Sequence, residues 1–424
     1  MMKKYITGLA TVLMVAGITG CDSPKRSGII TEQTLASYID NWQASKPEGT
    51  TGRLVIFQAG ATSDGKFLKH NDKDVLVYQI PAGGACDPSY MRHDGMTNIP
   101  GALLSGPYVD GMINMFGIDP EKDYVVFAVG KGNTTMREVV RSWWVLKYWG
   151  WDDNRLSFLD GSVSYDFSKS SGLSNYLVDK ATPPLDPTEY TQYSMKTVNN
   201  LHTELQTYLA DMMHIASLDD KTGYFIADAR GTTEYTGEKS SRFSDDLKCG
   251  PNRDEKCLMP LQGHIRDAID FPYTDLIVMD DQKEDITGDG VIDKNDASFK
   301  FRSNAELEKI YAEKGYKKGD KIITYCRTGC KATIVAITAG AVGYPVSMYD
   351  GSWVQWGELA GGRTDINGTE IVPEESHLNL DNPKYTTVTN RIEPEYTQES
   401  SIFKINLDAV TSNKIIEEDT AYMQ

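Results

Sequence analysis

Residues 321–331 read KIITYCRTGCK, and the apolar run ATIVAITAGAV follows at 332–342. The first five residues have the composition of a buried strand, whereas the later run is long enough for a helix. A strand, a short loop and a helix in this order are typical of α/β folds with a mostly parallel sheet. Sites in such sheets form at the carboxyl ends of strands, so we expect functional residues from Cys326 onward.

The loop between this strand and helix offers a reactive thiol. It consists of Cys326, Arg327, Thr328, Gly329, Cys330 and Lys331. Backbone N–H groups at a helix start, together with Arg327 and Lys331, favour the thiolate form of Cys326. The same cradle can hold the terminal sulfur of a persulfide or an oxyanion, and Gly329 permits a sharp backbone path. Taken alone, this spacing would suit a buried cysteine that only packs.

The pattern around this loop occurs twice in diverged form. Each unit has an apolar strand, a Gly/Pro segment, a second strand, a loop, a helix and an Asp-Gly-Ser turn. The matching pieces are 54–57, 99–103, 124–128, 136–148 and 159–162 in the first unit, and 224–228, 263–269, 321–325, 332–342 and 349–353 in the second. We therefore expect units at 33–165 and 191–362, a connector at 166–190 and a C-terminal extension at 363–424. The extension should wrap a domain or lack order, and only 401–407 looks strand-like.

Four motifs of the second unit resemble the rhodanese family of sulfurtransferases. They are Asp228-Ala-Arg230 with Glu234-Tyr235-x-Gly237, Gly263-His264-Ile265 with Ala268-Ile269, the six-residue loop, and Tyr349-Asp-Gly-Ser-Trp353 with Trp356. The last resembles the tandem-domain thiosulfate and mercaptopyruvate sulfurtransferases. The resemblance implies two rhodanese-like domains, each a mostly parallel sheet flanked by helices. The first would be non-catalytic, because its loop at 129–135 has no cysteine.

The same resemblance implies a cycle through Cys326. This residue would take sulfane sulfur from a small anionic donor and pass it to a thiol or cyanide. Arg230 matches an arginine that helps to bind the donor, although a structural ion pair, for example with Glu234, is the alternative. Lys331 stands where Thr, Arg or Ser is more usual, which leaves thiosulfate, mercaptopyruvate and polysulfide open as donors.

The remaining cysteines raise questions of pairing. Cys330 could form a disulfide with Cys326, resolve its persulfide, or be inert. Cys249 and Cys257 flank a short polar stretch and are expected to form a disulfide in an oxidising compartment, since a metal site would need more ligands. Cys86 is then left over and is expected to be a buried thiol.

Residues 285–296 match the template of a calcium loop. The expected ligands are Asp285, Thr287, Asp289, Val291 through its carbonyl, Asp293 and Asp296. Oxygen ligands at alternate positions converge on one cation, Gly290 allows the turn and Ile292 should pack inward. We expect a structural calcium ion on an insertion, with an acidic surface turn as the alternative.

The N-terminus reads as an export signal. Lys3 and Lys4 precede a short apolar run that ends in Ile-Thr-Gly-Cys21, which resembles a bacterial lipobox. Residues 1–20 would be removed, Cys21 would carry lipid and 21–32 would be a tether, unless this is an ordinary secretory signal. Asp22 resembles the inner-membrane retention signal of enteric bacteria. We therefore expect a lipid-anchored protein of the cell envelope, at the periplasmic face of the inner membrane.

The composition limits the possible functions. A formal net charge of −17 argues against nucleic acid as a partner. No organic cofactor is implied. Three functions remain: a sulfurtransferase, a non-enzymatic rhodanese-like binding or redox-sensing module of an envelope complex, and a phosphate- or arsenate-handling enzyme. The six-residue loop disfavours the third, because the phosphatase relatives have a longer loop.

Overall fold

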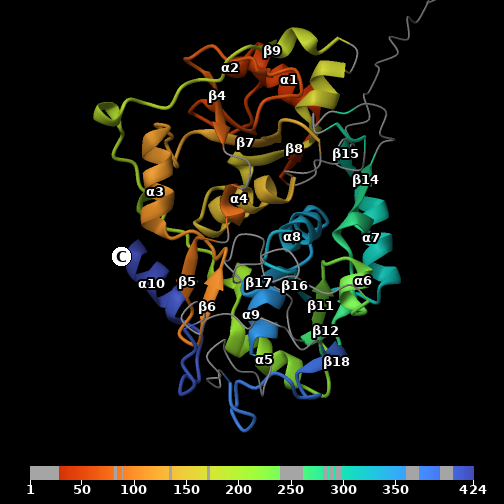
Figure 1. The fold of residues 1–424 in the computed structure, drawn as a ribbon. Coiled ribbons are helices and arrows are strands. Elements are labelled where there is room, and N and C mark those ends of the chain that lie inside the picture. Colours follow the sequence, from red (N-terminus) through yellow and green to blue (C-terminus); the bar gives the residue numbers. More distant parts are fainter. Residues whose placement is uncertain are drawn as a thin grey trace, which may run out of the picture.

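The computed structural model describes residues 28–80, 84–87, 89–132, 136–169, 172–238, 261–279, 285, 290–292, 298–359, 372–391 and 404–424. Two sheets dominate this part of the chain (Figure 1). The first has the strand order β1-β8-β7-β2-β4 and the second has the order β10-β17-β16-β11-β13. Both sheets are parallel throughout. The expected α/β class is confirmed, and the shared strand order supports a structural repeat.

The strands of the first sheet are β1 (Ile29–Ile30), β2 (Leu54–Ala59), β4 (Val75–Ile80), β7 (Tyr124–Val129) and β8 (Leu156–Ser162). Those of the second sheet are β10 (Gln206–Thr207), β11 (Tyr224–Asp228), β13 (Ile269–Asp270), β16 (Lys321–Tyr325) and β17 (Val346–Tyr349). Every residue of β2 and β7 is buried. This agrees with their unbroken apolar sequences, since a parallel sheet is covered on both faces.

Shorter antiparallel pairs flank the two sheets. They are β3 (Phe67–Leu68) with β9 (Leu177–Val178), β5 (Met91–His93) with β6 (Asn98–Pro100), β14 (Ile277–Met279) with β15 (Phe299–Phe301), and β12 (Leu261–Ile265) with β18 (Thr386–Arg391). The helices are α1 (Glu32–Asp40), α2 (Trp42–Ser45), α3 (Gly106–Met115), α4 (Met136–Tyr148), α5 (Leu209–Ser217), α6 (Thr232–Tyr235), α7 (Asn304–Glu313), α8 (Ala332–Ala341), α9 (Ser352–Glu358) and α10 (Lys414–Met423). No helix among the described residues combines the length and the apolar character that crossing a membrane requires.

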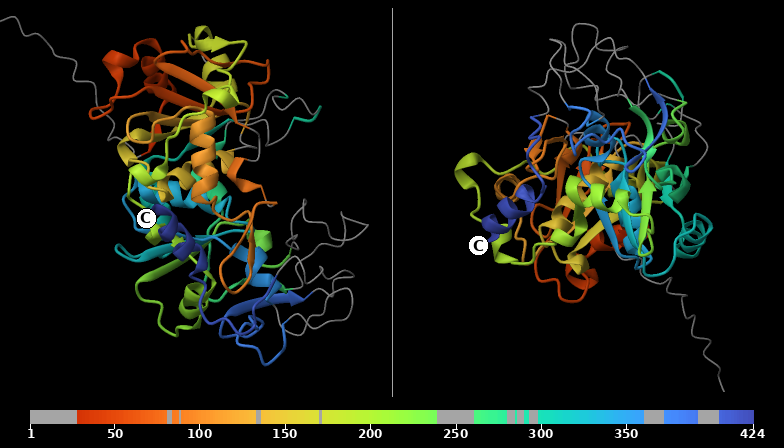
Figure 2. Two further views of the ribbon diagram at one scale, coloured as in Figure 1. Left: turned by 90° about the vertical axis from the view of Figure 1, so that its left-hand side faces the viewer. Right: turned by 90° about the horizontal axis from the view of Figure 1, so that it is seen from below.

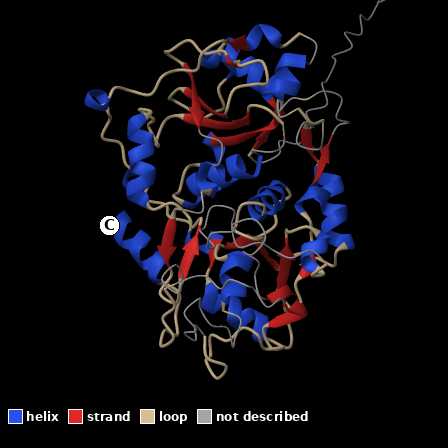
Figure 3. Cartoon of the chain, viewed as in Figure 1, coloured by secondary structure: helices blue, strands red, loops and turns tan. Residues whose placement is uncertain are grey.

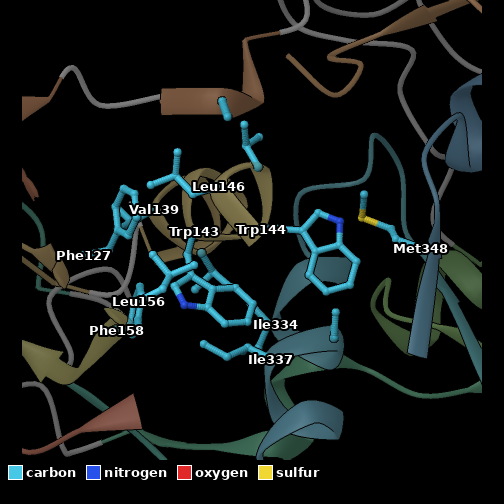
Figure 4. Close-up of a cluster of buried hydrophobic side chains, with 14 of the residues drawn as sticks. Phe127, Val139, Trp143, Trp144, Leu146, Leu156, Phe158, Ile334, Ile337 and Met348 are labelled. Carbon is cyan, nitrogen blue, oxygen red and sulfur yellow. The ribbon is translucent and has the colours of Figure 1, made fainter. Parts of the chain in front are cut away.

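Helices α4 and α8 pack against each other between the two sheets (Figure 3). Along the chain, α4 follows β7 of the first sheet and α8 follows β16 of the second. Their packing therefore brings the carboxyl ends of β7 and β16 close to the interface between the two units. All residues of α8 except Gly340 are buried, which explains why its sequence is apolar on every face. Figure 4 shows Trp143 and Trp144 of α4 beside Ile334 and Ile337 of α8. The two units therefore share one continuous core.

Three local expectations need correction. Part of the tether expected at 21–32 is the edge strand β1, because Ile29 is apolar and is buried against the sheet. The Asp-Gly-Ser segment at 159–162 completes β8 as a bulged strand end and is not a turn. In the extension, residues 404–407 form no strand, and 401–403 lie outside the described residues.

The extension instead contributes β18 and α10. Strand β18 pairs with β12 of the second unit, and α10 contacts α3 and β5 of the first. Figure 2 shows β18 at the outer end of the second unit and α10 farther toward the first. The extension thus contacts both units.

Candidate active site

Cys326 directly follows β16, which lies at the centre of the second sheet between β17 and β11. Strand β16 is buried from Ile322 to its end at Tyr325. The six residues 326–331 separate it from the start of α8 at Ala332. The Cys326 residue is 1% exposed, and among the described cysteines it is the one free thiol. The structure therefore places a protected thiol at the carboxyl end of a central strand and at the start of a helix, where the sequence pattern predicted it.

The backbone of α9 and of the residues before it holds this loop. The N–H of Cys326 donates to Ser352 Oγ at 3.3 Å, and the N–H of Trp353 donates to the carbonyl of Cys326 at 2.9 Å. A third bond of 2.9 Å joins the N–H of Val354 to the carbonyl of Arg327. Ser352 adopts φ of 51°, an uncommon conformation for a residue with a side chain. The Asp-Gly-Ser motif therefore supplies a loop support, which the sequence analysis did not assign to Ser352.

Gly329 makes the sharp path of the loop possible. Its φ is +82°, and a Cβ there would lie 3.4 Å from the carbonyl oxygen of Asp350. Asp350 is fully buried and forms an ion pair with Arg141 of α4. It also accepts the N–H of Leu103 at 2.8 Å. The first unit thus braces the underside of the cysteine loop through a buried charge pair.

Lys331 provides positive charge at the end of the loop. Its Nζ lies 3.9 Å from Glu234 Oε2 and 5.5 Å from the ring centre of Tyr273. Burial lowers the pKa of Lys331 below its ordinary value, whereas the nearby charges of Glu234 and Cys326 raise it. Arg327 and Thr328 are partly exposed. An anionic donor would meet Arg327 and Lys331 on its way to the thiol.

Arg230 lies in the interior, behind the loop. Its side chain is fully buried and forms an ion pair of 2.6 Å with Asp228, and it donates to the carbonyl of Gly263 at 2.6 Å. Its guanidinium stacks on the ring of Trp353 at 4.4 Å. The structure therefore favours the alternative of a structural ion pair, with Asp228 as a hydrogen-bonded partner.

Cys330 forms a disulfide with Cys86, a pairing that the sequence analysis missed. The Cα atoms are 5.9 Å apart, although 244 residues separate the two positions in the chain. The expectation that Cys86 is a leftover buried thiol was wrong. Cys330 is therefore not bonded to Cys326. The packing of α4 on α8 brings the turn that contains Cys86 to the loop, where it bonds to Cys330.

Only part of the expected calcium loop lies among the described residues. Asp285, Val291 and the neighbouring Gly290 and Ile292 are described, whereas Thr287, Asp289, Asp293 and Asp296 lie outside the described residues. Asp285 Oδ2 accepts the N–H of Gly290 at 2.8 Å. Ile292 is 55% exposed, so its expected inward packing was wrong. The described part of the chain contains no cluster of His, Cys, Asp or Glu suited to a metal ion.

Three other cysteines lie outside the described residues. They are Cys21, the expected lipid attachment site, and the expected disulfide partners Cys249 and Cys257. Their roles stay predictions.

Comparison with known proteins shows what the second unit and the whole chain are similar to. The family model described as a rhodanese-like domain matches residues 206–359. The thiosulfate sulfurtransferase of Corynebacterium glutamicum is 22% identical over 77% of this chain and 94% of its own length. The 3-mercaptopyruvate sulfurtransferase of Escherichia coli K12 is 23% identical over 77% of this chain and 93% of its own. The anaerobic ergothioneine biosynthesis enzyme from Chlorobium limicola shares the fold, with a TM-score of 0.51 and 13% identity, over 82% of this chain and 70% of that one.

The parallel sheet, the cysteine loop and the family match define residues 206–359 as a rhodanese-like domain. The chain therefore contains a rhodanese-like domain, as its motifs predicted. It resembles the two-domain thiosulfate and 3-mercaptopyruvate sulfurtransferases, with its cysteine loop in the second of its two units.

Proposed function

We propose that this protein transfers sulfane sulfur through a persulfide on Cys326. The observation that carries the proposal is the free, protected thiol at the carboxyl end of β16 and the amino end of α8. The Cys326 thiolate attacks the sulfane sulfur of a donor, the sulfur–sulfur or carbon–sulfur bond of the donor breaks, and the remainder leaves with the electron pair. An acceptor then attacks the terminal sulfur and restores the Cys326 thiolate.

A small anion fits this site best as donor. Arg327 and Lys331 stand in the same loop as the thiol, and cations of this kind attract carboxylate and thiosulfate groups. The two relatives described above are named for thiosulfate and for 3-mercaptopyruvate, which supports these two classes of donor. Polysulfide is the third candidate, and a thiol or cyanide is the acceptor.

The protein acts in the cell envelope, held to the membrane by a lipid on Cys21. The lipobox-like sequence supports this location, and so does the Cys86–Cys330 disulfide, since structural disulfides persist in oxidising compartments. A calcium ion held by residues 285–296 stabilises the hairpin of β14 and β15. The turn that Asp285 closes with Gly290 supports this role.

Intact-mass spectrometry tests the transfer directly. The full chain, purified in detergent without reductant, is incubated with thiosulfate and separately with 3-mercaptopyruvate. We expect the mass to rise by one sulfur atom and to return on addition of cyanide, and the donor that loads the protein identifies the substrate class.

The Cys326→Ser variant is the first test of the mechanism. It should gain no sulfur and lose all transfer activity, because a serine hydroxyl forms no persulfide. Its melting temperature should stay close to that of the wild type, since the substitution is nearly isosteric. A fully active Cys326→Ser protein would exclude the mechanism. If the wild type takes up no sulfur from either donor or from polysulfide, the binding-module function is favoured instead.

A further inference from the structure

The Cys86–Cys330 disulfide joins the first domain to the cysteine loop of the second. Cys86 ends a short turn, Gly84–Cys86, that packs on α4 of the first domain. The N–H of Ala85 donates to Ser142 Oγ of that helix at 3.3 Å. Cys330 is the fifth residue of the loop that begins with Cys326. A residue of the non-catalytic domain therefore controls the chemical state of a residue in the catalytic loop.

The loop itself does not depend on this bond for its position. Its first two residues are held by the backbone of Trp353 and Val354, and its underside is braced by Asp350. The buried packing of α4 on α8 continues beside it. Opening the disulfide would therefore leave the loop in place and release a Cys330 thiol four residues from the nucleophile.

A free Cys330 thiol would be an internal nucleophile in the same loop as a persulfide on Cys326. The Cys330 thiolate can attack Cys326 Sγ, so that a Cys326–Cys330 disulfide forms and the bond to the outer sulfur breaks. The outer sulfur leaves with the electron pair and the persulfide proton as hydrosulfide. The nucleophile is then blocked until an external dithiol reduces the new disulfide.

We propose that Cys86 protects the persulfide by holding Cys330 in a disulfide. This inference rests on the proposed function and adds its regulation. With the Cys86–Cys330 bond closed, the protein is a sulfur carrier that delivers sulfane sulfur to an external acceptor. When a dithiol opens the bond, the same loop discharges the sulfur as hydrosulfide and stops.

Three proteins test the proposal: the wild type, Cys86→Ser, and the double variant Cys86→Ser/Cys330→Ser. Each full chain is loaded with the donor that loads the wild type, without reductant, and is followed by intact mass and by hydrosulfide release. The wild type should keep its extra sulfur atom. Cys86→Ser should lose the persulfide about tenfold faster or more, release one hydrosulfide per chain, and yield a peptide linking Cys326 to Cys330. The double variant should hold the persulfide again.

The comparison separates the two proposals. If wild type and double variant both take up no sulfur from any donor, the sulfurtransferase mechanism fails. If Cys86→Ser holds its persulfide as long as the wild type, only the protective role of Cys86 fails. Peptide mapping of the unreduced wild type that shows no link between Cys86 and Cys330 also overturns that role. Melting curves of the three proteins establish that each is folded.

Discussion

At the scale of the residue, Arg230 shows how burial changes the meaning of a motif. An arginine next to the first-strand motif of the second domain looks like a donor-binding group in the sequence. In the structure its charge is neutralised by Asp228, and Tyr325 donates to the same carboxylate at 2.7 Å. The contacts of the motif therefore favour a structural role for Arg230.

Arg230→Met should accordingly lower stability. Removal of one partner leaves Asp228 buried and unpaired, and we expect a loss of about 3–5 kcal/mol in the free energy of unfolding. Denaturant titration measures this loss. Arg266→Met is the matched control, because its ion pair with Asp219 is largely exposed and should be worth less than about 1 kcal/mol. An unchanged unfolding curve combined with a raised KM for the donor would instead assign Arg230 to substrate binding.

Lys331 should give the stability a specific pH dependence. Its pKa in the folded state is lowered by burial, so between that pKa and the ordinary value near 10.5 the unfolded chain binds more protons than the folded one. Stability contributed by this residue therefore increases as pH rises through that window. The unfolding free energy of the wild type minus that of Lys331→Met should therefore become more positive as pH rises toward 10.5.

Unfolding titrations at several alkaline pH values measure this slope. Lys318→Met serves as the control for the loss of a surface lysine, since Lys318 is exposed. A pH dependence for Lys331→Met no different from that for Lys318→Met would refute the lowered pKa of Lys331. At neutral pH, Lys331→Met should turn over an anionic donor more slowly than the wild type, because one cation of the loop is lost.

At the scale of the element, the hairpin of β14 and β15 connects the domains. Lys300 of β15 forms ion pairs of 2.9 Å with Glu32 and 2.8 Å with Asp166 of the first domain. The ring of Phe301 packs edge-on against that of Phe158, with 5.8 Å between the ring centres. The expected calcium loop belongs to the insertion between these two strands. If the insertion binds calcium as proposed, the ion would stabilise this interdomain contact.

Calcium removal should consequently lower the melting temperature. A chelator should shift thermal unfolding of the wild type downward, and added calcium should restore it, because binding to the native state alone stabilises that state. Asp285→Ala should abolish this response, since Asp285 is the first ligand of the template. Identical melting curves of the wild type with chelator and with calcium would show that the segment is an acidic surface turn. Persulfide formation itself should change less than stability.

At the scale of the whole molecule, the C-terminal helix fastens the extension to the first domain. Asp419 of α10 pairs with Arg92 of β5 at 2.7 Å, and Tyr148 of α4 donates to it at 2.9 Å. The side chains of Arg92 and Asp419 are 7% and 2% exposed. A buried charge pair of this kind depends on both partners, because either one alone would be a desolvated charge.

Asp419→Ala should therefore destabilise the protein by about 3–5 kcal/mol. Glu418→Ala is a closely matched control, since Glu418 also contacts Arg92 but its side chain is 50% exposed, and it should cost less than about 1 kcal/mol. Chemical denaturation of the two variants gives the comparison. Equal effects would mean that the helix is not held by the buried pair.

By itself, the sequence determined the local features of this protein. The strand and helix around Cys326, the duplicated pattern and the family motifs all depend on short-range hydrophobic periodicity and on turn residues, which neighbouring side chains decide. The class of the fold and the placement of Cys326 after a strand could be predicted for that reason, whereas the family was inferred from the resemblance of four motifs. Short-range patterns also suggested Gly329 as the residue that permits the loop.

Only the tertiary structure decided which distant groups meet. The bond between Cys86 and Cys330 and the attachment of α10 to Arg92 depend on how two domains and an extension pack. Arg230 and Asp228 are neighbours in the sequence, but the fold of the second domain decides that their ion pair is buried. Spacing along a chain carries no information on contacts between distant residues. The chemistry of the nucleophile is thus a local property, whereas the state of the cysteine beside it depends on the fold as a whole.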